Sequence, residues 1–331
     1  MILHSKELIE EYTVKGYWGT RTLLDLFYKN CEAHPERMAV EDPPDRIELV
    51  GTPPKSLTYA QFKQAVEAMA DELLRRGLNK DEVVVVQLPN IWELAALYLA
   101  IALAGGIISP LPWQWREKDV GYVLKLTGAR FYIAPEWFKG FGYLKMGSEL
   151  GFKHVISLDE IGGVIKRRPA FNFPAQIQID ANEVFTICWT SGTEANPKGC
   201  PLTHNNWLFG GNLVLRTCKL QKGDRILCVA PLVNMTGVGV NYVPWLLTGG
   251  TLVLHHPLNM QVLLQQLTNS NVHFTILVPA VLNMIIKLPV ENSPDLSSIR
   301  TIATGSAPPS SWAMIELGKL RNLEPLISKG F

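Results

Sequence analysis

The chain has 331 residues, of which 47% are hydrophobic and 18% are charged, so it is long enough for about two globular domains and too apolar to be disordered. Lys and Arg total 31 against 30 Asp and Glu, and this net charge of +1 gives no electrostatic basis for binding nucleic acid or an anionic membrane as the main partner. The five cysteines form no C-x-x-C pair, which predicts structural thiols in a reducing, cytoplasmic compartment and no metal site.

The N-terminal residues predict no secretory signal, because Lys6, Glu7 and further glutamates interrupt any apolar stretch. Residues 59–76 repeat apolar side chains at three- and four-residue intervals and are followed by Gly77, a pattern that predicts a helix. The next run, 83–88, is continuous and rich in valine, as expected for a strand that is covered on both faces.

Residues 94–111 contain no charged side chain and approach the length of a membrane span. Gly105 and Gly106 interrupt this segment, and a helix made of its first half reaches only roughly 16 Å, too short to cross a bilayer. We therefore predict a buried helix over 94–104, a buried strand over 107–111, and no membrane span. A helix from Glu117 and a strand over 130–134 follow.

A second array of elements follows residues 167–174, a Pro-containing segment without clear periodicity that we interpret as the domain boundary. Its predicted elements are strands over 184–189, 225–230, 251–254, 273–278 and 299–303, and helices from Asn205 and over 238–247, 260–268 and 280–287. Repeated β-α-β units favour parallel sheets. The predicted fold class is α/β, with two doubly wound, mostly parallel sheets wrapped by helices and divided into regions 1–170 and 171–331.

Residues 190–199 form a polar loop directly after the strand predicted at 184–189. Its residue types suit a phosphate, because hydroxyls donate to phosphate oxygens, a glycine admits close approach of the backbone, and a lysine supplies a mobile positive charge. These residues are Thr190, Ser191, Gly192, Thr193 and Lys198. Since the loop follows a strand, we expect it at the carboxyl edge of a sheet, where α/β proteins bind ligands.

Two other interpretations of this loop compete with a phosphate site. Ser, Thr, Gly, Asn and Pro are also common in turns, so a polar surface turn remains open. A Walker-type P-loop is excluded, because Pro197 precedes Lys198 and Gly199 follows it, which leaves no hydroxyl placed for Mg²⁺.

The sequence TSGTEANPKG at 190–199, followed by PLTHNN, resembles the signature loop of the adenylate-forming (AMP-binding) superfamily, whose usual form is T-S-G-T-T-G-x-P-K-G. Glu194 and Ala195 depart from that form, and Asn234 stands where the family usually has histidine. Further segments resemble the family's motifs in the same order: SLTY at 56–59, LAGG at 103–106, PLVNMTG at 231–237, VP at 278–279 and GSAP at 305–308. The resemblance covers nearly the whole chain and implies the N-terminal portion of an acyl- or aryl-CoA synthetase.

The resemblance implies an ATP-dependent acid–CoA ligase that uses ATP, Mg²⁺ and coenzyme A and activates a carboxylic acid. It assigns binding of the ATP phosphates to Thr190, Ser191, Gly192, Thr193 and Lys198, and the adenine side to Gly305, Ser306, Ala307 and Pro308. It makes Asn234, Val238, Asn241 and Tyr242 candidates for the acid pocket, with ordinary core packing as the alternative for Val238 and Tyr242. For His204, a position in a loop or at the start of a helix is favoured over a catalytic role.

The family's remaining motifs begin at about the point where this chain ends, at Phe331. We therefore expect the C-terminal catalytic domain to be absent from residues 1–331, and we assign no catalytic residue and no metal ligand to them. Two alternatives stay open: an acyl-adenylating enzyme that serves a carrier protein, and a catalytically incompetent fragment that binds nucleotide or acid. An open sheet edge or apolar surface near Phe331 would favour self-association into homo-oligomers.

Overall fold

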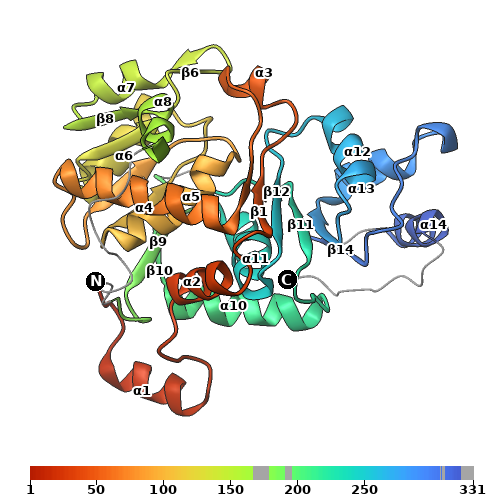
Figure 1. The fold of residues 1–331 in the computed structure, drawn as a ribbon, viewed down its shortest axis with the longest axis horizontal. Coiled ribbons are helices and arrows are strands. Elements are labelled where there is room, and N and C mark those ends of the chain that lie inside the picture. The colour runs from red at the N-terminus through yellow and green to blue at the C-terminus, as the bar shows by residue number, and fades with distance from the viewer. Residues whose placement is uncertain (167–178, 191–195, 306, 308–309, 322–331) are drawn as a thin grey trace.

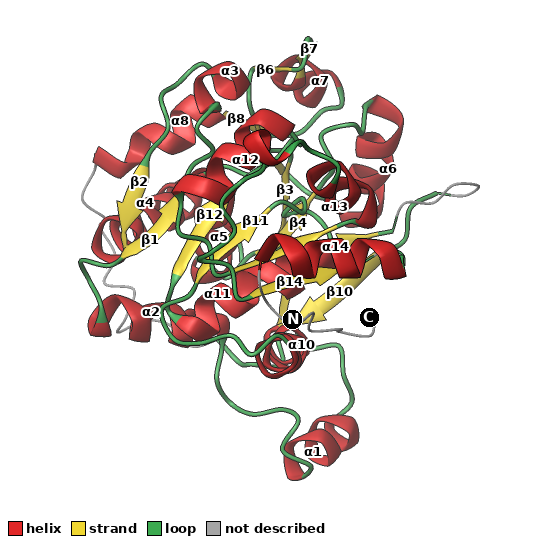
Figure 2. Cartoon of the chain, turned by 90° about the vertical axis from the view of Figure 1, so that its right-hand side faces the viewer, coloured by secondary structure: helices red, strands yellow, loops and turns green. Residues whose placement is uncertain are grey.

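The computed structural model of the chain describes residues 1–166, 179–190, 196–305, 307 and 310–321. Two six-stranded sheets lie among helices (Figures 1 and 2), which confirms the predicted α/β class. The first sheet has the order β10-β9-β4-β3-β5-β8 and the second has the order β14-β13-β11-β12-β1-β2. The pairs β9–β10 and β1–β2 are antiparallel, and the other pairs in the two sheets are parallel.

The strands of the first sheet are β3 (Val83–Val86), β4 (Ile107–Pro110), β5 (Phe131–Ala134), β8 (His154–Ser157), β9 (Val184–Trp189) and β10 (Gly199–Thr203). Those of the second sheet are β1 (Met38–Glu41), β2 (Ser56–Thr58), β11 (Arg225–Cys228), β12 (Thr251–Leu254), β13 (Phe274–Leu277) and β14 (Thr301–Thr304). A separate hairpin pairs β6 (Trp137–Phe138) with β7 (Phe141–Gly142).

The longer helices are α1 (Lys6–Val14), α2 (Leu23–Ala33), α4 (Tyr59–Arg75), α5 (Trp92–Leu103), α6 (Glu117–Thr127), α10 (His204–Thr217), α12 (Met260–Asn269), α13 (Pro279–Ile286) and α14 (Ser311–Arg321). Shorter ones are α3 (Arg46–Val50), α7 (Tyr143–Glu149), α8 (Leu158–Gly163), η1 (Val164–Lys166), α11 (Val243–Thr248) and η3 (Val290–Asn292). The helix predicted over 238–247 is divided, because a π-helix, η2 (Gly237–Tyr242), precedes α11.

The sheets exchange strands across the boundary predicted near residue 170, which itself lies outside the described residues. Strands β9 and β10 follow that boundary in sequence but complete the first sheet beside β4. Strands β1 and β2 precede it but extend the second sheet beside β12. The order of the chain therefore does not separate the sheets, because apolar patterning marks a strand without indicating which sheet it joins.

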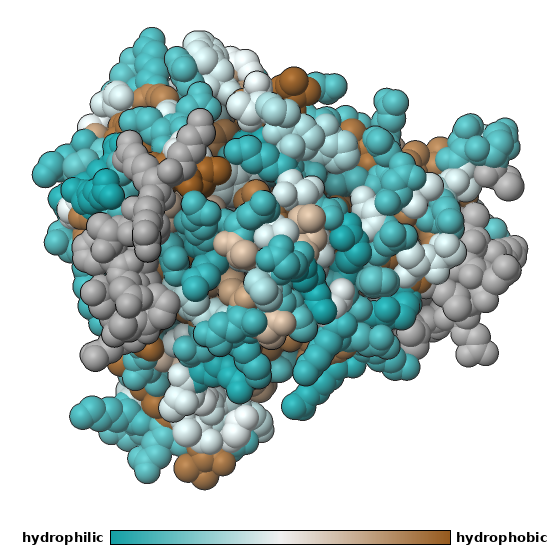
Figure 3. Space-filling model, viewed as in Figure 1, coloured by the Kyte–Doolittle hydropathy of each residue, from teal (hydrophilic) through white to brown (hydrophobic). Residues whose placement is uncertain are grey.

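Helix α5 forms the centre of the core. All of its residues are buried, and one apolar cluster extends from strands of the first sheet, such as Val84 and Ile108, to strands of the second, such as Ile226 and Leu252. This burial explains the uncharged run at 94–111, which forms a buried helix and strand as predicted. None of the helices in the described parts of the chain combines the length and apolar composition needed to cross a bilayer. Figure 3 shows a face on which hydrophilic side chains predominate and apolar ones are scattered.

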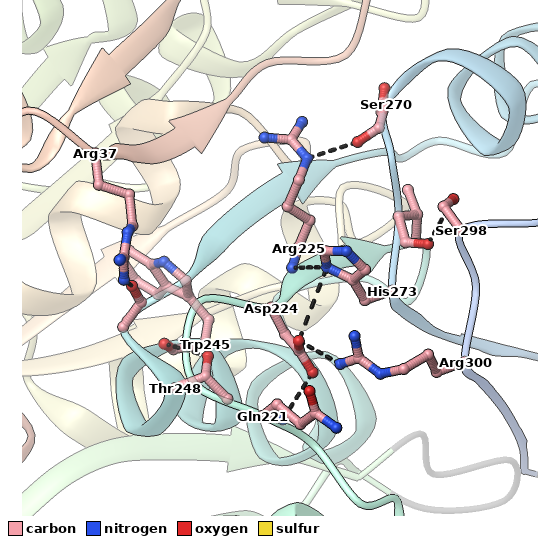
Figure 4. A network of polar contacts seen from close by, with 12 residues as sticks. Arg37, Gln221, Asp224, Arg225, Trp245, Thr248, Ser270, His273, Ser298 and Arg300 are labelled. Atoms are coloured by element: carbon pink, nitrogen blue, oxygen red, sulfur yellow. Dashed lines mark hydrogen bonds and ion pairs between the residues drawn. The ribbon is translucent and has the colours of Figure 1, made fainter.

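The amino ends of the strands in the second sheet are joined by polar side chains (Figure 4). Asp224, just before β11, pairs with Arg300, just before β14, and accepts the backbone N–H of Gln221 at 2.8 Å. His273, just before β13, accepts the N–H of Arg225 through Nδ1 at 3.0 Å. Asp224, His273 and Arg300 at the amino ends of these strands therefore bind neighbouring groups of the protein. The carboxyl ends of the strands, in contrast, border a cavity.

Candidate functional site

The carboxyl ends of strands from both sheets surround a cavity of about 230 Å³. Its walls come from segments that follow β3, β4, β11 and β12, and from the last residue of β9. The lining residues are Leu88, Asn90, Pro112, Trp113, Gln114, Trp115, Trp189, Pro231, Val233, Asn234 and His256. In α/β proteins ligands bind outside the carboxyl ends of parallel strands, so this cavity is the natural position for a substrate.

The predicted phosphate loop begins at this same edge. Strand β9 ends at Trp189, and β10 returns from Gly199 opposite it. Between them, the Thr190 N–H donates to the Lys198 carbonyl at 3.0 Å, and the Lys198 N–H donates to the Thr190 hydroxyl at 3.2 Å. These two bonds close the neck of a hairpin, from which the Lys198 side chain is exposed to solvent.

Three residues predicted to bind phosphate, Ser191, Gly192 and Thr193, lie outside the described residues, as do the family departures Glu194 and Ala195. The neck formed by Thr190 and Lys198 is described, and it places the loop at the carboxyl edge of the first sheet as predicted. The sequence prediction passed directly from the loop to a helix at Asn205. Strand β10 lies between the two and pairs with β9, so the chain forms a second antiparallel strand before the helix begins.

Trp189 forms a fixed wall between the hairpin and the cavity. Its indole N–H donates to the hydroxyl of Ser109 on β4 at 2.8 Å, and both groups are buried. A Cβ added at Gly199 would lie 3.0 Å from the Ile187 side chain and 3.1 Å from the Trp189 ring. The Trp189 ring also meets Trp115 edge-on, with the ring centroids 6.3 Å apart. The glycine of the hairpin therefore makes room for the indole that borders the cavity.

Of the four residues predicted for the acid pocket, Asn234 lines this cavity, and the other three are buried in the protein core. The Asn234 side-chain oxygen accepts the N–H of Gly237 at 2.9 Å, so this side chain also starts the following helix. Tyr242 donates its hydroxyl to the Ala95 carbonyl at 2.7 Å, and burial raises its pKa well above the usual range. Val238 packs in the central apolar cluster, and Asn241 donates to the Thr236 carbonyl at 3.2 Å.

The residues predicted for the adenine side follow β14. Gly305 comes directly after this strand, and Ala307 is exposed, whereas Ser306 and Pro308 lie outside the described residues. Because β14 is parallel to β13, Gly305 lies at the carboxyl edge of the second sheet. The hairpin of β9 and β10, predicted to bind phosphate, and the segment after β14, predicted for the adenine side, therefore belong to different sheets, each at its carboxyl edge.

The cavity carries no formal charge at neutral pH among the described residues that line it. None of these is Asp, Glu, Lys or Arg, and burial lowers the pKa of His256 to about 4, so its imidazole is neutral. Aromatic rings and prolines supply much of the surface. An engineered apolar cavity of roughly 150 Å³ holds benzene, so about 230 Å³ accommodates a small ring or a short chain.

His204 starts α10, as predicted, and has a structural role. Its Nδ1 accepts the backbone N–H of Leu23 at 3.2 Å, at the beginning of α2. Burial lowers its pKa to about 4, which keeps the ring neutral and able to accept this bond. Within the described ranges, no three His, Cys, Asp or Glu side chains gather to hold a metal ion.

Sequence reasoning missed Asn90, Trp113, Trp115 and His256 as cavity residues. A signal for them existed, because each follows a strand by a few residues, and such segments converge at the carboxyl edge of a parallel sheet. Asn90 was the clearest case, as a polar residue soon after the valine-rich strand at 83–86.

Comparison with known proteins identifies relatives for most of the chain. The AMP-binding enzyme family matches residues 27–328. The medium-chain fatty-acid–CoA ligase of Escherichia coli (strain K12) is 30% identical over 239 residues, which cover 68% of this chain and 40% of that ligase. The vibriobactin-specific 2,3-dihydroxybenzoate-AMP ligase of Vibrio cholerae serotype O1 is 25% identical over 330 residues, which cover 94% of this chain and 58% of that protein.

A solved structure with the same fold is the inhibitor-bound N-terminal domain of FACL13 from Mycobacterium tuberculosis. It matches with a TM-score of 0.77 and 18% identity, over 90% of this chain and 73% of that one. At this identity the likeness shows the fold alone. The chain spans about half the length of the curated relatives it matches.

Proposed function

Because the chain belongs to the AMP-binding enzyme family, we propose that it forms the nucleotide- and acid-binding part of an ATP-dependent acid–CoA ligase. The observation that carries the proposal is the position of the hairpin neck, with Thr190 and exposed Lys198, beside an uncharged cavity at the junction of two sheets. A triphosphate needs hydroxyl, amide and cationic donors, whereas the organic part of a substrate needs an uncharged space. Both are available at this one edge.

In the proposed reaction, a carboxylate oxygen attacks the α-phosphorus of ATP, and the bond from that phosphorus to the bridging oxygen breaks. Pyrophosphate leaves with the bond's electron pair, and the acid becomes an acyl-adenylate. The thiol of coenzyme A then attacks the acyl carbon, loses its proton, and releases AMP. Such steps depend on holding the leaving phosphates in position and neutralising their charge.

We assign the β- and γ-phosphates to Thr190, Ser191, Gly192, Thr193 and Lys198, and the adenine side to Gly305, Ser306, Ala307 and Pro308. Asn234 is the one residue of the acid-pocket set that also borders the cavity. We assign Mg²⁺ no protein ligand within residues 1–331 and expect it to bind the phosphates of ATP. The cavity receives an uncharged organic part of a substrate.

Coenzyme A is the proposed acceptor, and a carrier-protein thiol is the alternative. The relatives include both a CoA ligase and an AMP ligase, so similarity alone supports either acceptor. Acyl-adenylate formation is common to the two reactions, which makes acid-dependent exchange of labelled pyrophosphate into ATP the first assay. Addition of coenzyme A then separates them through thioester formation.

Replacement of Lys198 tests the phosphate assignment. In the full-length protein, we expect Lys198→Ala to lower acid-dependent ATP–pyrophosphate exchange at least tenfold, or roughly 1.4 kcal/mol, because one positive charge beside the leaving phosphates is lost. Lys222→Ala is the matched control, because Lys222 is also exposed but lies just before Asp224, at the opposite edge of the second sheet. Equal rates for the two variants would remove the hairpin from the mechanism.

A further inference from the structure

The side chain of Asn90 links the two sheets at the edge where the cavity lies. Asn90 follows β3 of the first sheet and is 1% exposed. Its Nδ2 lies 2.9 Å from the Ala230 carbonyl and 3.1 Å from the His255 carbonyl, both beyond strand ends of the second sheet. Its Oδ1 accepts the N–H of Leu232 at 2.8 Å. One amide group is thus bound to the loop after β11 and to the loop after β12.

These backbone groups adjoin the residues that form one wall of the cavity. Pro231, Val233 and Asn234 belong to the first of the two loops, and His256 follows His255 in the second. Leu232 is held from both sides, because its carbonyl also accepts the hydroxyl of Tyr98 on α5. Trp189, the last residue of β9 in the first sheet, also lines the cavity. The position of the second sheet's lining residues relative to Trp189 therefore depends on contacts such as those of Asn90.

We propose that Asn90 is a positioning residue for acyl-adenylate formation. It holds the loops after β11 and β12 at a fixed distance from the phosphate hairpin, so that the substrate parts bound by the two sheets meet in one orientation. This inference rests on the function proposed above. The proposed role of Asn90 is to orient the bound substrates and not to strengthen their binding. Displacing reacting groups by about 1 Å can lower the rate of the chemical step on the order of 100-fold.

The chemistry of the position requires an amide. The Asn90 nitrogen faces carbonyl oxygens, which need a donor, and its oxygen faces an N–H, which needs an acceptor. An aspartate at this position keeps the acceptor, but its other oxygen carries at most one proton and so replaces at most one of the two N–H donors. Asn90→Asp therefore breaks the link to Ala230, to His255 or to both with almost no change in side-chain volume, and the loops can separate from the first sheet.

Asn205 provides a matched control. It is also buried, at 3% exposure, and its amide makes an equivalent set of bonds: Nδ2 donates to the Gly19 carbonyl at 3.0 Å and to Asn182 at 2.9 Å, and Oδ1 accepts the Gly19 N–H at 3.0 Å. None of these residues lines the cavity. Asn205→Asp thus disrupts an amide network of the same kind away from the substrate edge.

The experiment compares Asn90→Asp, Asn205→Asp and the unmodified protein, each in the full-length protein, at a temperature where all three are folded. We expect Asn90→Asp to lower kcat for acid-dependent ATP–pyrophosphate exchange roughly 10- to 100-fold with KM for ATP changed less than about threefold. Asn205→Asp should keep kcat within about threefold. Amide hydrogen exchange should accelerate in segments 229–236 and 254–258 for Asn90→Asp, and in segments 17–23 and 180–184 for Asn205→Asp.

The outcomes separate this inference from the proposed function. If no carboxylic acid supports pyrophosphate exchange by the unmodified full-length protein, the proposed function fails, and the positioning role for that reaction fails with it. If exchange activity is present but Asn90→Asp and Asn205→Asp share the same kcat, the positioning role is overturned while the ligase function stands. Unchanged hydrogen exchange over 229–236 in Asn90→Asp would also overturn it, because the loop would then not depend on this amide.

Discussion

The hydroxyl of Ser109 fixes the tryptophan that separates the phosphate hairpin from the cavity, and its removal should affect both stability and substrate binding. The Trp189 indole N–H donates to this hydroxyl at 2.8 Å between buried groups. Ser109→Ala leaves the N–H without its partner, and a buried donor in that state costs about 1–3 kcal/mol. In a domain of about 150–250 residues, 1 kcal/mol corresponds to roughly 2–4 °C in Tm, so the loss is measurable by thermal or urea unfolding.

Thr186 supplies a control with the same chemistry. Its hydroxyl accepts the indole N–H of Trp207 at 3.0 Å, again between buried groups, but neither residue lines the cavity. Thr186→Val should therefore cost a similar 1–3 kcal/mol in the free energy of unfolding. Only Ser109→Ala frees a ring that borders the cavity, so we expect it alone to raise KM for the acid, by about fivefold or roughly 1 kcal/mol.

The assay is acid-dependent ATP–pyrophosphate exchange with the acid as the varied substrate, beside urea unfolding of both variants. Equal effects of Ser109→Ala and Thr186→Val on KM would mean that KM for the acid depends on overall stability and not on the position of Trp189. A Ser109→Ala protein with normal stability would mean that the indole finds another acceptor at once. Either result would refute the idea that the Ser109–Trp189 bond fixes this wall of the cavity.

Two further substitutions test the turn after β11 and the start of α10. Gly237→Ala should lower the free energy of unfolding by more than about 3 kcal/mol, because the added Cβ would overlap the backbone carbonyl of Pro231. Its control is Gly210→Ala in α10, which should be neutral or stabilising because the space around its Cβ is open. Equal urea midpoints for the two variants would contradict this prediction. His204→Gln should make the free energy of unfolding less dependent on low pH, because burial lowers the pKa of His204 from its ordinary value near 6.5 to about 4. As the pH falls, the unfolded chain binds this proton before the native protein does. The unmodified protein should therefore lose about 2 kcal/mol in the free energy of unfolding between pH 7 and pH 5, and the variant should keep it. Parallel pH profiles of urea stability for the two proteins would exclude this contribution of His204.

The sequence was sufficient to predict elements whose surroundings are uniform. The strand at 83–86 and the helix α5 have apolar neighbours on all sides, so an uninterrupted apolar run identifies them. Strand β10 has no such pattern, because Gly199–Thr203 is partly exposed and contains Pro201. It lies at the edge of the first sheet, where proline is tolerated since one side of the strand needs no ladder hydrogen bonds. A turn-like sequence therefore conceals the strand that pairs with β9.

The acid pocket shows a second limit of sequence reasoning. The resemblance to the family's motif at 231–237 made Asn234 and three residues of the helix after it, Val238, Asn241 and Tyr242, candidates for the acid pocket. Helical spacing indicates which residues share a face but not whether that face meets a substrate or the core. The Tyr242 hydroxyl reaches the Ala95 carbonyl of α5, a long-range contact that no local pattern encodes. The position of Asn90 soon after a strand was visible in the sequence, but its bonds to the second sheet were not, since its partners lie more than a hundred residues further along the chain.

The position of the site at a junction of two sheets has a consequence for substitutions far from any substrate. The phosphate hairpin belongs to the first sheet, and Asn234 and Gly305 belong to the second. Their relative position is set by what lies between the sheets, and α5 contributes there both its buried apolar surface and the polar contacts of Tyr98 and Ala95 to the segment after β11. Packed interiors transmit small changes in volume as displacements. Helix α12 packs outside this junction, against β11–β13 of the second sheet. Shortening a buried side chain of α5 should therefore reduce the rate of adenylate formation more than an equally destabilising truncation in α12.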